Sequence, residues 1–474
     1  MWPIVVRRLL LPAHEALLRR PTFAVARRLA RDEAVAPLAA AERQRAQLAQ
    51  LIRHALRASP YWRERAEREG WTADSPLAAL PLLTRADVAR HREAMRCADA
   101  SGRLILDTSS GTTGDSLVFY LDREAQAWNR ALRLHALARL GIAPGERQLH
   151  VWPEYRGGTL GAAKALVRAA RDRLTNDPVF DLRPMTPERL DAGLAFLDRW
   201  RPAALIGYPS WLHALARRRL QRRAAKGAGR AWTPRRVVTT AELLYDFQRR
   251  AIESAFGAPV SEEYGSQGVG LVASEDAAGR WRLHWQHALV ELCTAGRPTR
   301  PGERGELIVT NLHSHAMPFL RFATGDVAQA PLEAEPGDGL GFGRQLLPRI
   351  DGRTSDLLVA EDGRLVGNRT LVDAVVRETG LDDFGLHQPA PDRLVWLTPL
   401  GDDEASRGAV TELLHSLLGR SMQVDWLSAR AFVPPPSGKR RYVCSPVAQA
   451  LLAHDAESGR AHAQGWPQRV FAPA

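Results

Sequence analysis

Residues 109–114 form a short run of hydroxyl-bearing residues and glycines with the chemistry to bind an anion. Two glycines let a backbone approach a phosphate closely, and four hydroxyls can donate hydrogen bonds to its oxygens. The run differs from the P-loop, which requires a lysine after the last glycine and a helix directly behind it. Here Asp115 follows, and then an apolar run typical of a strand, so an ordinary Ser/Gly hairpin remains an alternative. The run consists of Ser109, Ser110, Gly111, Thr112, Thr113 and Gly114.

Lysine is rare in this chain, so each lysine is a candidate for a specific chemical role. Lys164, Lys226 and Lys439 are the three lysines among 65 basic residues. This bias toward arginine accompanies the net charge of +12, so the charge by itself does not indicate a nucleic-acid partner. A lysine in such a composition suggests chemistry that a compact ammonium performs and a wide, planar guanidinium does not.

Strand-like and helical segments alternate through the middle of the chain. Apolar residues at helical spacing over 41–57 predict that the first hundred residues are helical. Further on, we expect strands at 104–106, 117–121, 205–206, 237–238 and 260, and helices over 122–140, 211–223 and 245–256. Asp122 and Gly141 are placed to begin and end the first of these helices. The alternation predicts a largely parallel sheet covered by helices.

Two later regions differ from this pattern. Residues 281–329 alternate apolar and polar side chains around Trp281, Leu283 and Trp285, which predicts a β-rich subdomain. Beyond Arg353, about 120 residues contain a strand-turn and helical stretches. We therefore expect an α/β protein with a large N-terminal domain over 1–355 and a small, mobile α+β domain over 356–474.

Composition excludes several classes of protein. The 37 glycines and 31 prolines show no period, so the chain is not collagen-like. No apolar run approaches the roughly 18–20 residues of a bilayer span, and arginines interrupt the first twenty residues. We expect no transmembrane segment and a cytoplasmic location. Cys97, Cys293 and Cys444 are too few for a disulfide framework. The basic stretch 217–236 contains one aromatic residue, Trp232, which is little support for base stacking, so we expect no nucleic-acid partner.

Five segments occur in the order and rough spacing found in the adenylate-forming enzymes, and the chain resembles that superfamily. These segments are residues 109–114, 264–266, 321–326, 349–356 and 437–439. Residues 60–63, 80–85, 207–210 and 241–242 resemble the phenylacetate–CoA ligase branch, especially its capsule-biosynthesis-type (CapK-like) members. The resemblance covers roughly residues 40–445.

The resemblance implies an AMP-forming ligase that uses ATP and Mg²⁺ to convert an aryl or acyl carboxylic acid to an acyl-adenylate, releasing pyrophosphate. It implies that residues 109–114 hold the departing phosphates and that Lys439 bridges the attacking carboxylate and the α-phosphate. Asp326 would accept hydrogen bonds from the ribose hydroxyls, with Arg353 beside it, and Asp356 would be the hinge between domains. The adenine pocket would be lined by Ala241, Glu242, Tyr264, Gly265 and Ser266. The acid would enter near residues 207–210, where Tyr208 and Trp211 pack its organic group.

Two departures from the family pattern leave alternatives open. Gly268 stands where relatives carry a glutamate that helps to hold Mg²⁺, and Glu262, Glu263 or Glu275 are the possible substitutes. The chain could alternatively be a catalytically degenerate member that binds a nucleotide without turning it over. Residues 357–366 lack the Gly-rich pattern of CoA-forming relatives. The acceptor therefore stays open among CoA, a carrier-protein thiol, an amine and a hydroxyl.

Two other possibilities concern metal and membrane. Some relatives carry a Cys/His zinc site, but this chain offers one thiol among its candidate ligands, so we expect no complete tetrahedral site. The candidates are His284, His287, Cys293, His313 and His315. Residues 1–31 could lie on an anionic membrane surface as a basic amphipathic helix.

Overall fold

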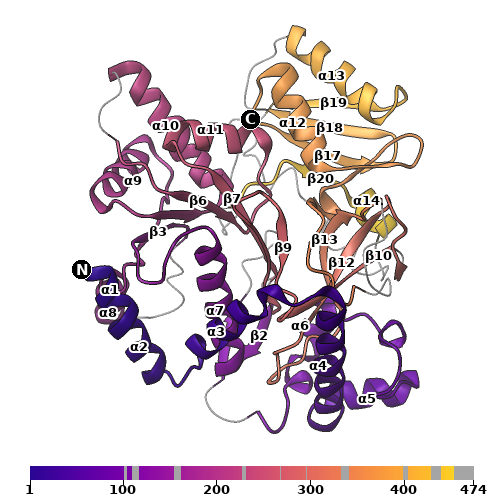
Figure 1. Cartoon of the computed structure of the whole chain (residues 1–474). Coiled ribbons are helices and arrows are strands. Elements are labelled where there is room, and N and C mark those ends of the chain that lie inside the picture. The colour runs from indigo at the N-terminus through magenta and orange to yellow at the C-terminus, as the bar shows by residue number, and fades with distance from the viewer. Residues whose placement is uncertain are drawn as a thin grey trace.

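The computed structural model describes residues 1–100, 104–108, 117–153, 162–226, 231–266, 268–294, 296–332, 341–398, 404–428 and 439–452. These residues form an α/β protein with a helix-covered, largely parallel sheet, an antiparallel sheet and a smaller C-terminal sheet (Figure 1). The fold class predicted from the sequence is confirmed.

The largest sheet has seven strands in the order β4-β3-β5-β6-β7-β8-β9. Strands β3 to β7 run parallel, and helices α8 to α11 connect them in sequence. This connectivity brings the carboxyl ends of the parallel strands to one edge of the sheet, where α/β folds bind ligands. The strands are β3 (Gln148–Val151), β4 (Val179–Phe180), β5 (Ala204–Gly207), β6 (Arg236–Thr240), β7 (Val260–Ser266), β8 (Gly270–Glu275) and β9 (Trp281–Leu283).

The helices beside this sheet bury their large side chains against it. The helices are α8 (Ala162–Leu174), α9 (Pro187–Trp200), α10 (Pro209–Lys226) and α11 (Asp246–Phe256). Trp211 of α10 and Phe256 of α11 are fully buried in one apolar cluster with Leu205 and Val237 of the sheet. The strands and helices expected between residues 205 and 260 are therefore confirmed.

An antiparallel sheet in the order β11-β10-β12-β13-β14 forms the β-rich region. Its strands are β10 (Ala288–Thr294), β11 (Arg297–Pro298), β12 (Arg304–Asn311), β13 (Phe322–Gln329) and β14 (Ile350–Arg353). The assignment of Trp281 and Leu283 to this region is wrong, because β9 pairs with β8 and extends the seven-stranded sheet. The turn between them explains the difference, since Asp276 accepts the backbone N–H groups of Ala278 and Arg280 and closes a hairpin.

Helices make up most of the first hundred residues, as predicted. They are α1 (Trp2–Val5), η1 (Val6–Leu10), α2 (Leu11–Leu17), α3 (Thr22–Arg31), η2 (Asp32–Ala34), α4 (Pro37–Ala58), α5 (Pro60–Glu69), η3 (Leu77–Ala79) and α6 (Arg85–Met95). Helix α4 packs on the β-rich region, where Gln44 donates to the carbonyl oxygen of Trp285 at 2.9 Å. No helix in the described part of the chain has the length and apolar character to cross a bilayer.

A hairpin and a capped helix follow α6. Strands β1 (Ile105–Thr108) and β2 (Val118–Leu121) pair antiparallel, and residues 109–116 between them lie outside the described residues. The Asp122 side chain accepts the Ala125 N–H at 2.7 Å and caps α7 (Arg123–Arg139). Gly141 has φ +79° just past the helix end, so both boundaries predicted for this helix are confirmed.

The C-terminal region has a sheet of its own in the order β19-β18-β17-β20. Its core includes Phe384 stacked on Trp396, with ring centroids 4.5 Å apart. The predicted boundary at residue 356 lies in the short helix η4 and stays a prediction. The elements are η4 (Thr354–Asp356), β15 (Leu358–Val359), β16 (Leu365–Val366), α12 (Asn368–Thr379), β17 (Gly385–Ala390), β18 (Arg393–Thr398), α13 (Glu404–Leu418), β19 (Gln423–Ser428), β20 (Val443–Cys444) and α14 (Pro446–Leu452).

Candidate active site

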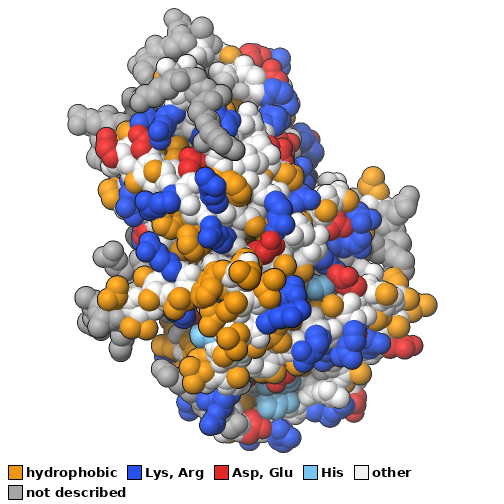
Figure 2. Space-filling view, turned by 60° about the vertical axis from the view of Figure 1, so that its left-hand side comes forward, with side chains coloured by type: hydrophobic (Ala, Val, Ile, Leu, Met, Phe, Trp, Pro, Cys, Tyr) orange, Lys and Arg blue, Asp and Glu red, His pale blue; other side chains and the backbone are white. Residues whose placement is uncertain are grey.

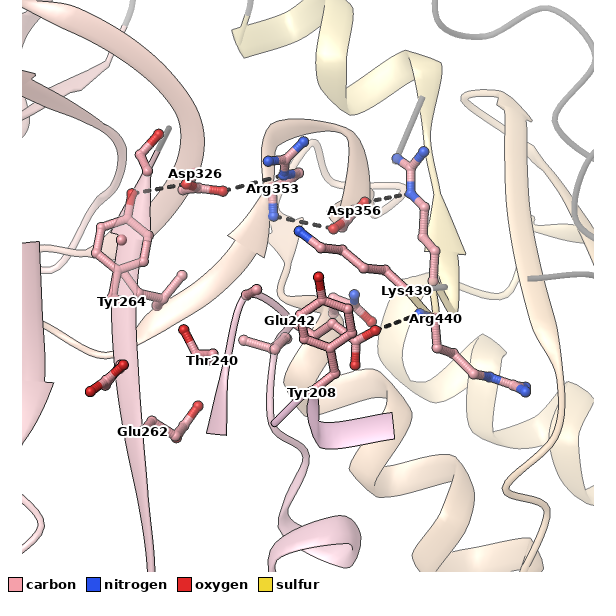
Figure 3. Close-up of a pocket in the computed structure, with 18 of the residues that line it drawn as sticks. Tyr208, Thr240, Glu242, Glu262, Tyr264, Asp326, Arg353, Asp356, Lys439 and Arg440 are labelled. Carbon is pink, nitrogen blue, oxygen red and sulfur yellow. Dashed lines mark hydrogen bonds and ion pairs between the residues drawn. The ribbon is translucent and has the colours of Figure 1, made fainter. Parts of the chain in front are cut away.

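A cavity of about 500 Å³ lies where the carboxyl ends of β6 and β7 meet β13, β14 and the segment before β20. It contains the described residues predicted for the adenine pocket, the ribose contact, the hinge and the catalytic lysine (Figure 3). The predicted phosphate loop, residues 109–114, lies outside the described residues. The predicted residues that line the cavity are Ala241, Glu242, Tyr264, Gly265, Ser266, Asp326, Arg353, Asp356 and Lys439.

Neighbouring strands hold one wall of this cavity. Asp326 of β13 and Arg353 of β14 are paired across the ladder, and the Arg353 Nε lies 3.4 Å from Asp326 Oδ1. The Tyr264 hydroxyl of β7 donates to Asp326 Oδ2 at 2.8 Å. Burial raises the pKa of Asp326, and the Arg353 charge opposes that rise. Burial together with Asp326 keeps the pKa of Tyr264 well above its usual value, so the phenol remains a donor.

Lys439 enters the cavity from the opposite wall (Figure 3). Its Nζ lies 5.6 Å from the centre of the Tyr208 ring. Burial, reinforced by the positive charge of Arg353, lowers the pKa of Lys439 to about 8, while Glu242 and Asp326 oppose the shift. At neutral pH the side chain is thus mostly a partly desolvated ammonium inside the cavity.

Glu242 follows strand β6 and links the large sheet to the segment that carries Lys439. Its Oε1 accepts the Arg440 backbone N–H at 2.8 Å and the Ser210 hydroxyl at 3.0 Å, and its Oε2 accepts the Ser210 N–H at 3.0 Å. Burial raises the pKa of Glu242, and these hydrogen bonds oppose the shift. The carboxylate is thus engaged by protein groups from two segments far apart in the sequence. The adenine-pocket role that the family resemblance implies for it stays a prediction.

Asp356 is held by the segment that follows Lys439. The Arg441 Nε donates to Asp356 Oδ1 at 2.7 Å, and Arg441 also donates to the Ser355 carbonyl oxygen at 3.0 Å. The predicted hinge residue is therefore tied to the second residue after the lysine. The sequence motifs predict no role for Arg440 or Arg441, although their place beside Lys439 was the available signal.

Three glutamates were predicted substitutes for the carboxylate that Gly268 lacks, and their surroundings differ. Glu262 and Glu275 both lie near Arg249, at 3.1 and 3.0 Å. Glu263 lines the cavity with its side chain almost fully buried, and its Oε2 has no hydrogen-bond partner among the described residues. The same oxygen lies 3.3 Å from an Arg133 nitrogen, so Glu263 is ion-paired there without accepting a hydrogen bond.

Position 268 has no room for a side chain. A Cβ there would lie 2.6 Å from two ring carbons of Phe319, and the backbone φ is +85°, which favours glycine. The missing glutamate is thus coupled to the packing of a fully buried phenylalanine.

One further sequence prediction differs in the structure. Tyr208 lines the cavity, but Trp211 is fully buried in the core behind it, so the prediction that Trp211 packs the acid is wrong. Among the described residues, no group of metal-binding side chains includes Cys293, which lies beside Arg321 instead. His287 and His313 each hydrogen-bond a backbone carbonyl oxygen, at 2.7 and 3.0 Å.

The chain is similar in sequence and in fold to adenylate-forming enzymes. No family model matches the chain. Among curated proteins it is 23% identical to protein CapK of Staphylococcus aureus over 372 residues, covering 78% of this chain and 80% of the relative. It is 25% identical to phenylacetate-coenzyme A ligase of Escherichia coli (strain K12) over 324 residues, covering 65% of this chain and 70% of the relative. These relatives confirm the predicted branch and the predicted class of AMP-forming ligases.

A solved structure has the same fold. A 2-hydroxyisobutyryl-CoA ligase in the postadenylation state, in complex with R3-HIB-AMP, matches with a TM-score of 0.63 and 19% identity. The match covers 88% of this chain and 90% of that chain. The similarity therefore extends over nearly the whole length of both proteins.

Proposed function

We propose that the protein uses ATP to activate a small carboxylic acid as an acyl-adenylate, releases pyrophosphate, and then transfers the acyl group to a thiol. The observation that carries this proposal is the Lys439 ammonium, which shares one cavity with Asp326 and Arg353. A carboxylate and a triphosphate repel each other, and a cation between them reduces that repulsion.

In the proposed reaction, an oxygen of the substrate carboxylate attacks the α-phosphorus of ATP. The bond from that phosphorus to the bridging oxygen breaks, and pyrophosphate leaves with the electron pair. Negative charge grows on the oxygens around phosphorus, where Lys439 stabilises it. An ammonium suits this position because it is compact and can donate to two oxygens at once, whereas a guanidinium is a wide planar fork.

Asp326 is proposed to bind the ribose. One of its oxygens accepts from Tyr264 and the other lies near Arg353, yet a carboxylate has about four acceptor positions. The remaining positions can accept the ribose hydroxyls. Arg353 and Tyr264 would keep the carboxylate oriented during this contact.

The organic part of the acid is proposed to lie against the aromatic side of the cavity. Trp152, Tyr208 and Trp281 line the cavity together with the polar residues. Apolar walls with a few convergent polar groups are usual for small-molecule sites. This lining supports an aryl or acyl substrate.

Glu263 is proposed to hold Mg²⁺ in place of the carboxylate absent at position 268. The buried Oε2 of Glu263 accepts no hydrogen bond from the described residues, and a carboxylate oxygen suits a hard cation that prefers oxygen ligands. When bound, Mg²⁺ would neutralise part of the phosphate charge. Arg133, 3.3 Å from the same oxygen, would then turn toward the phosphates.

The acceptor thiol is proposed to be that of CoA. Support comes from the curated phenylacetate-coenzyme A ligase relatives. The hairpin of β15 and β16 replaces the Gly-rich pattern of other CoA-forming enzymes, so a carrier-protein thiol is the competing acceptor.

The test is ATP–pyrophosphate exchange across a panel of aryl and acyl acids, followed by product analysis with CoA. We expect Mg²⁺-dependent exchange with a subset of acids, and loss of at least about 100-fold in the Lys439→Ala variant. ATP binding measured by calorimetry should largely survive in that variant. Full pyrophosphate release by Lys439→Ala would overturn the proposal.

A second candidate is a degenerate nucleotide-binding protein, which the glycine at position 268 favours. Such a protein would bind ATP in the same cavity but show no exchange with any acid. The same panel separates the two functions.

A further inference from the structure

The N-terminal helices present an apolar surface to solvent, although their opposite face already packs on the protein. Val6 and Leu11 are buried, whereas Trp2, Ile4 and Leu9 are exposed, with Leu9 62% accessible. An ordinary surface helix turns polar residues outward. Here the outward face is apolar and is interrupted by the exposed side chains of Arg7 and Arg8.

Helix α8 extends this surface. Leu166 and Val167 are 73% and 70% exposed. Leu174 is also exposed and lies about two turns further along the same side of the helix, seven residues after Val167. The two regions meet at Gly145, where an added Cβ would lie 2.7 Å from the Pro3 carbonyl oxygen. Asn176, just after α8, donates to the Gly145 carbonyl oxygen at 2.7 Å.

Figure 2 turns this edge of the molecule toward the viewer and shows hydrophobic side chains gathered on it, with basic side chains around them. We call this surface the N-terminal apolar face. It consists of Trp2, Ile4, Val5, Leu9, Leu166, Val167 and Leu174.

The charge around the N-terminal apolar face is mostly positive, with Asp172 of α8 paired to Arg171 at 2.6 Å. Residues 1–31 contain seven arginines and a single acidic residue, Glu15. Glu15 is buried and accepts hydrogen bonds from Arg20 and Thr22, so it offers no carboxylate to solvent. Helix α8 adds exposed arginines at positions 171 and 173.

We propose that the N-terminal apolar face docks the protein on the surface of an anionic phospholipid bilayer. Apolar side chains, including a tryptophan, would enter the boundary between headgroups and acyl chains, while the arginines pair with lipid phosphates. A contiguous apolar surface of this kind on a protein usually marks an interaction site.

Charge also argues against a second copy of the chain as the occupant. In a symmetric dimer the same patch meets itself, so the arginines around the face would oppose one another. An anionic bilayer instead satisfies the apolar side chains and the arginines together. The inference does not depend on the proposed enzymatic function.

The test is co-sedimentation of the full-length protein with phosphatidylcholine vesicles, with and without phosphatidylglycerol. We expect binding only to the anionic vesicles, and weaker binding at high salt because exposed charges are screened. Two double variants address the two contributions: Ile4→Asp with Leu9→Asp, and Arg7→Glu with Arg8→Glu. Each should lower the partition coefficient at least about tenfold, because the first places charges in the apolar contact and the second reverses two charges that pair with lipid phosphates.

Matched controls carry the same changes elsewhere. Leu332 is 82% exposed near Gly302 in the β-rich region, so Leu332→Asp should leave binding unchanged. Arg300→Glu with Arg377→Glu matches the charge change on other exposed side chains. Thermal unfolding checks that each variant is folded, and the arginine pair keeps the test decisive if the aspartate pair misfolds. The proposal is overturned by absence of wild-type binding to anionic vesicles, by equal losses in variants and controls, or by a dimer that the face variants dissociate.

Discussion

The two walls of the cavity are built in different ways. Asp326 and Arg353 lie on adjacent strands, and backbone ladders fix their separation. Lys439 lies outside any strand, and its neighbours are held by the Glu242–Arg440 and Asp356–Arg441 contacts at 2.8 and 2.7 Å. A ladder yields only when a sheet opens, whereas a side-chain contact can be released alone. The wall that carries the ammonium is therefore the one that single substitutions, and motion, can shift.

Substitution of the ammonium itself should have the largest effect. We expect Lys439→Arg to lower kcat/KM for ATP–pyrophosphate exchange at least about 100-fold, nearly as much as Lys439→Ala, because a guanidinium does not fit the same geometry. Arg377→Ala, on the exposed side of α12, is the control and should leave the rate unchanged. Near-normal exchange by Lys439→Arg would mean that charge alone suffices on this wall.

The strand-held wall should be sensitive to packing rather than to charge. Gly268→Ala places a Cβ against the Phe319 ring in a backbone conformation that disfavours side chains, and we expect it to lower the free energy of unfolding by about 2 kcal/mol. Gly279→Ala is a matched control, because Gly279 has φ +75° but no atom within 4 Å of an added Cβ. Chemical denaturation measures both variants, and equal losses would remove Phe319 from the explanation.

Glu242→Gln tests the contact that positions the lysine segment. Its amide group would face the Ser210 N–H as a second donor, and we expect kcat for exchange to fall about tenfold while the KM for ATP changes little. Loss of the Glu242 charge should also lower the pKa of Lys439 and move the alkaline limb of the pH profile to lower pH. Glu412→Gln, on an exposed side chain, is the control. An unchanged pH profile would reduce Glu242 to a structural role.

The smallest predicted effect comes from pH. In the proposed mechanism Lys439 acts as a cation, so activity should be full below its pKa and lost above it. Burial brings that pKa to about 8, and kcat/KM should fall to half near that pH and continue downward. The residual activity of Lys439→Arg should lack this limb, because a guanidinium stays protonated. A wild-type rate that stays flat to pH 10 would argue against a buried catalytic ammonium.

Much of the fold could be predicted because local signals agree with it. Asp122 and Gly141 mark the ends of α7 by capping chemistry that acts within a few residues. Trp281 and Leu283 were assigned to the wrong sheet for the opposite reason. Their alternation correctly indicates a strand, but pairing with β8 depends on a turn closed by Asp276.

The candidate site, like the fold, could be predicted from the sequence only in part. Ordered motifs were enough to name nine residues that line one cavity. They did not reveal that Glu242 contacts Ser210 and Arg440, because that contact joins segments separated by 32 and 198 positions. Trp211 shows the converse error, since residue type alone does not tell a pocket wall from the core behind it.

The short spacing between Lys439 and β20 limits how far the amine can travel by itself. Val443 begins the strand and pairs with Leu386, so three residues separate the lysine from the small sheet. The four Cα–Cα steps from Lys439 to Val443 span at most about 14 Å when fully extended. Because this connection is so short, the Lys439 amine can move far only if the small sheet moves with it. Removing the amine from the cavity to admit a bulky second substrate therefore requires displacement of the whole small sheet.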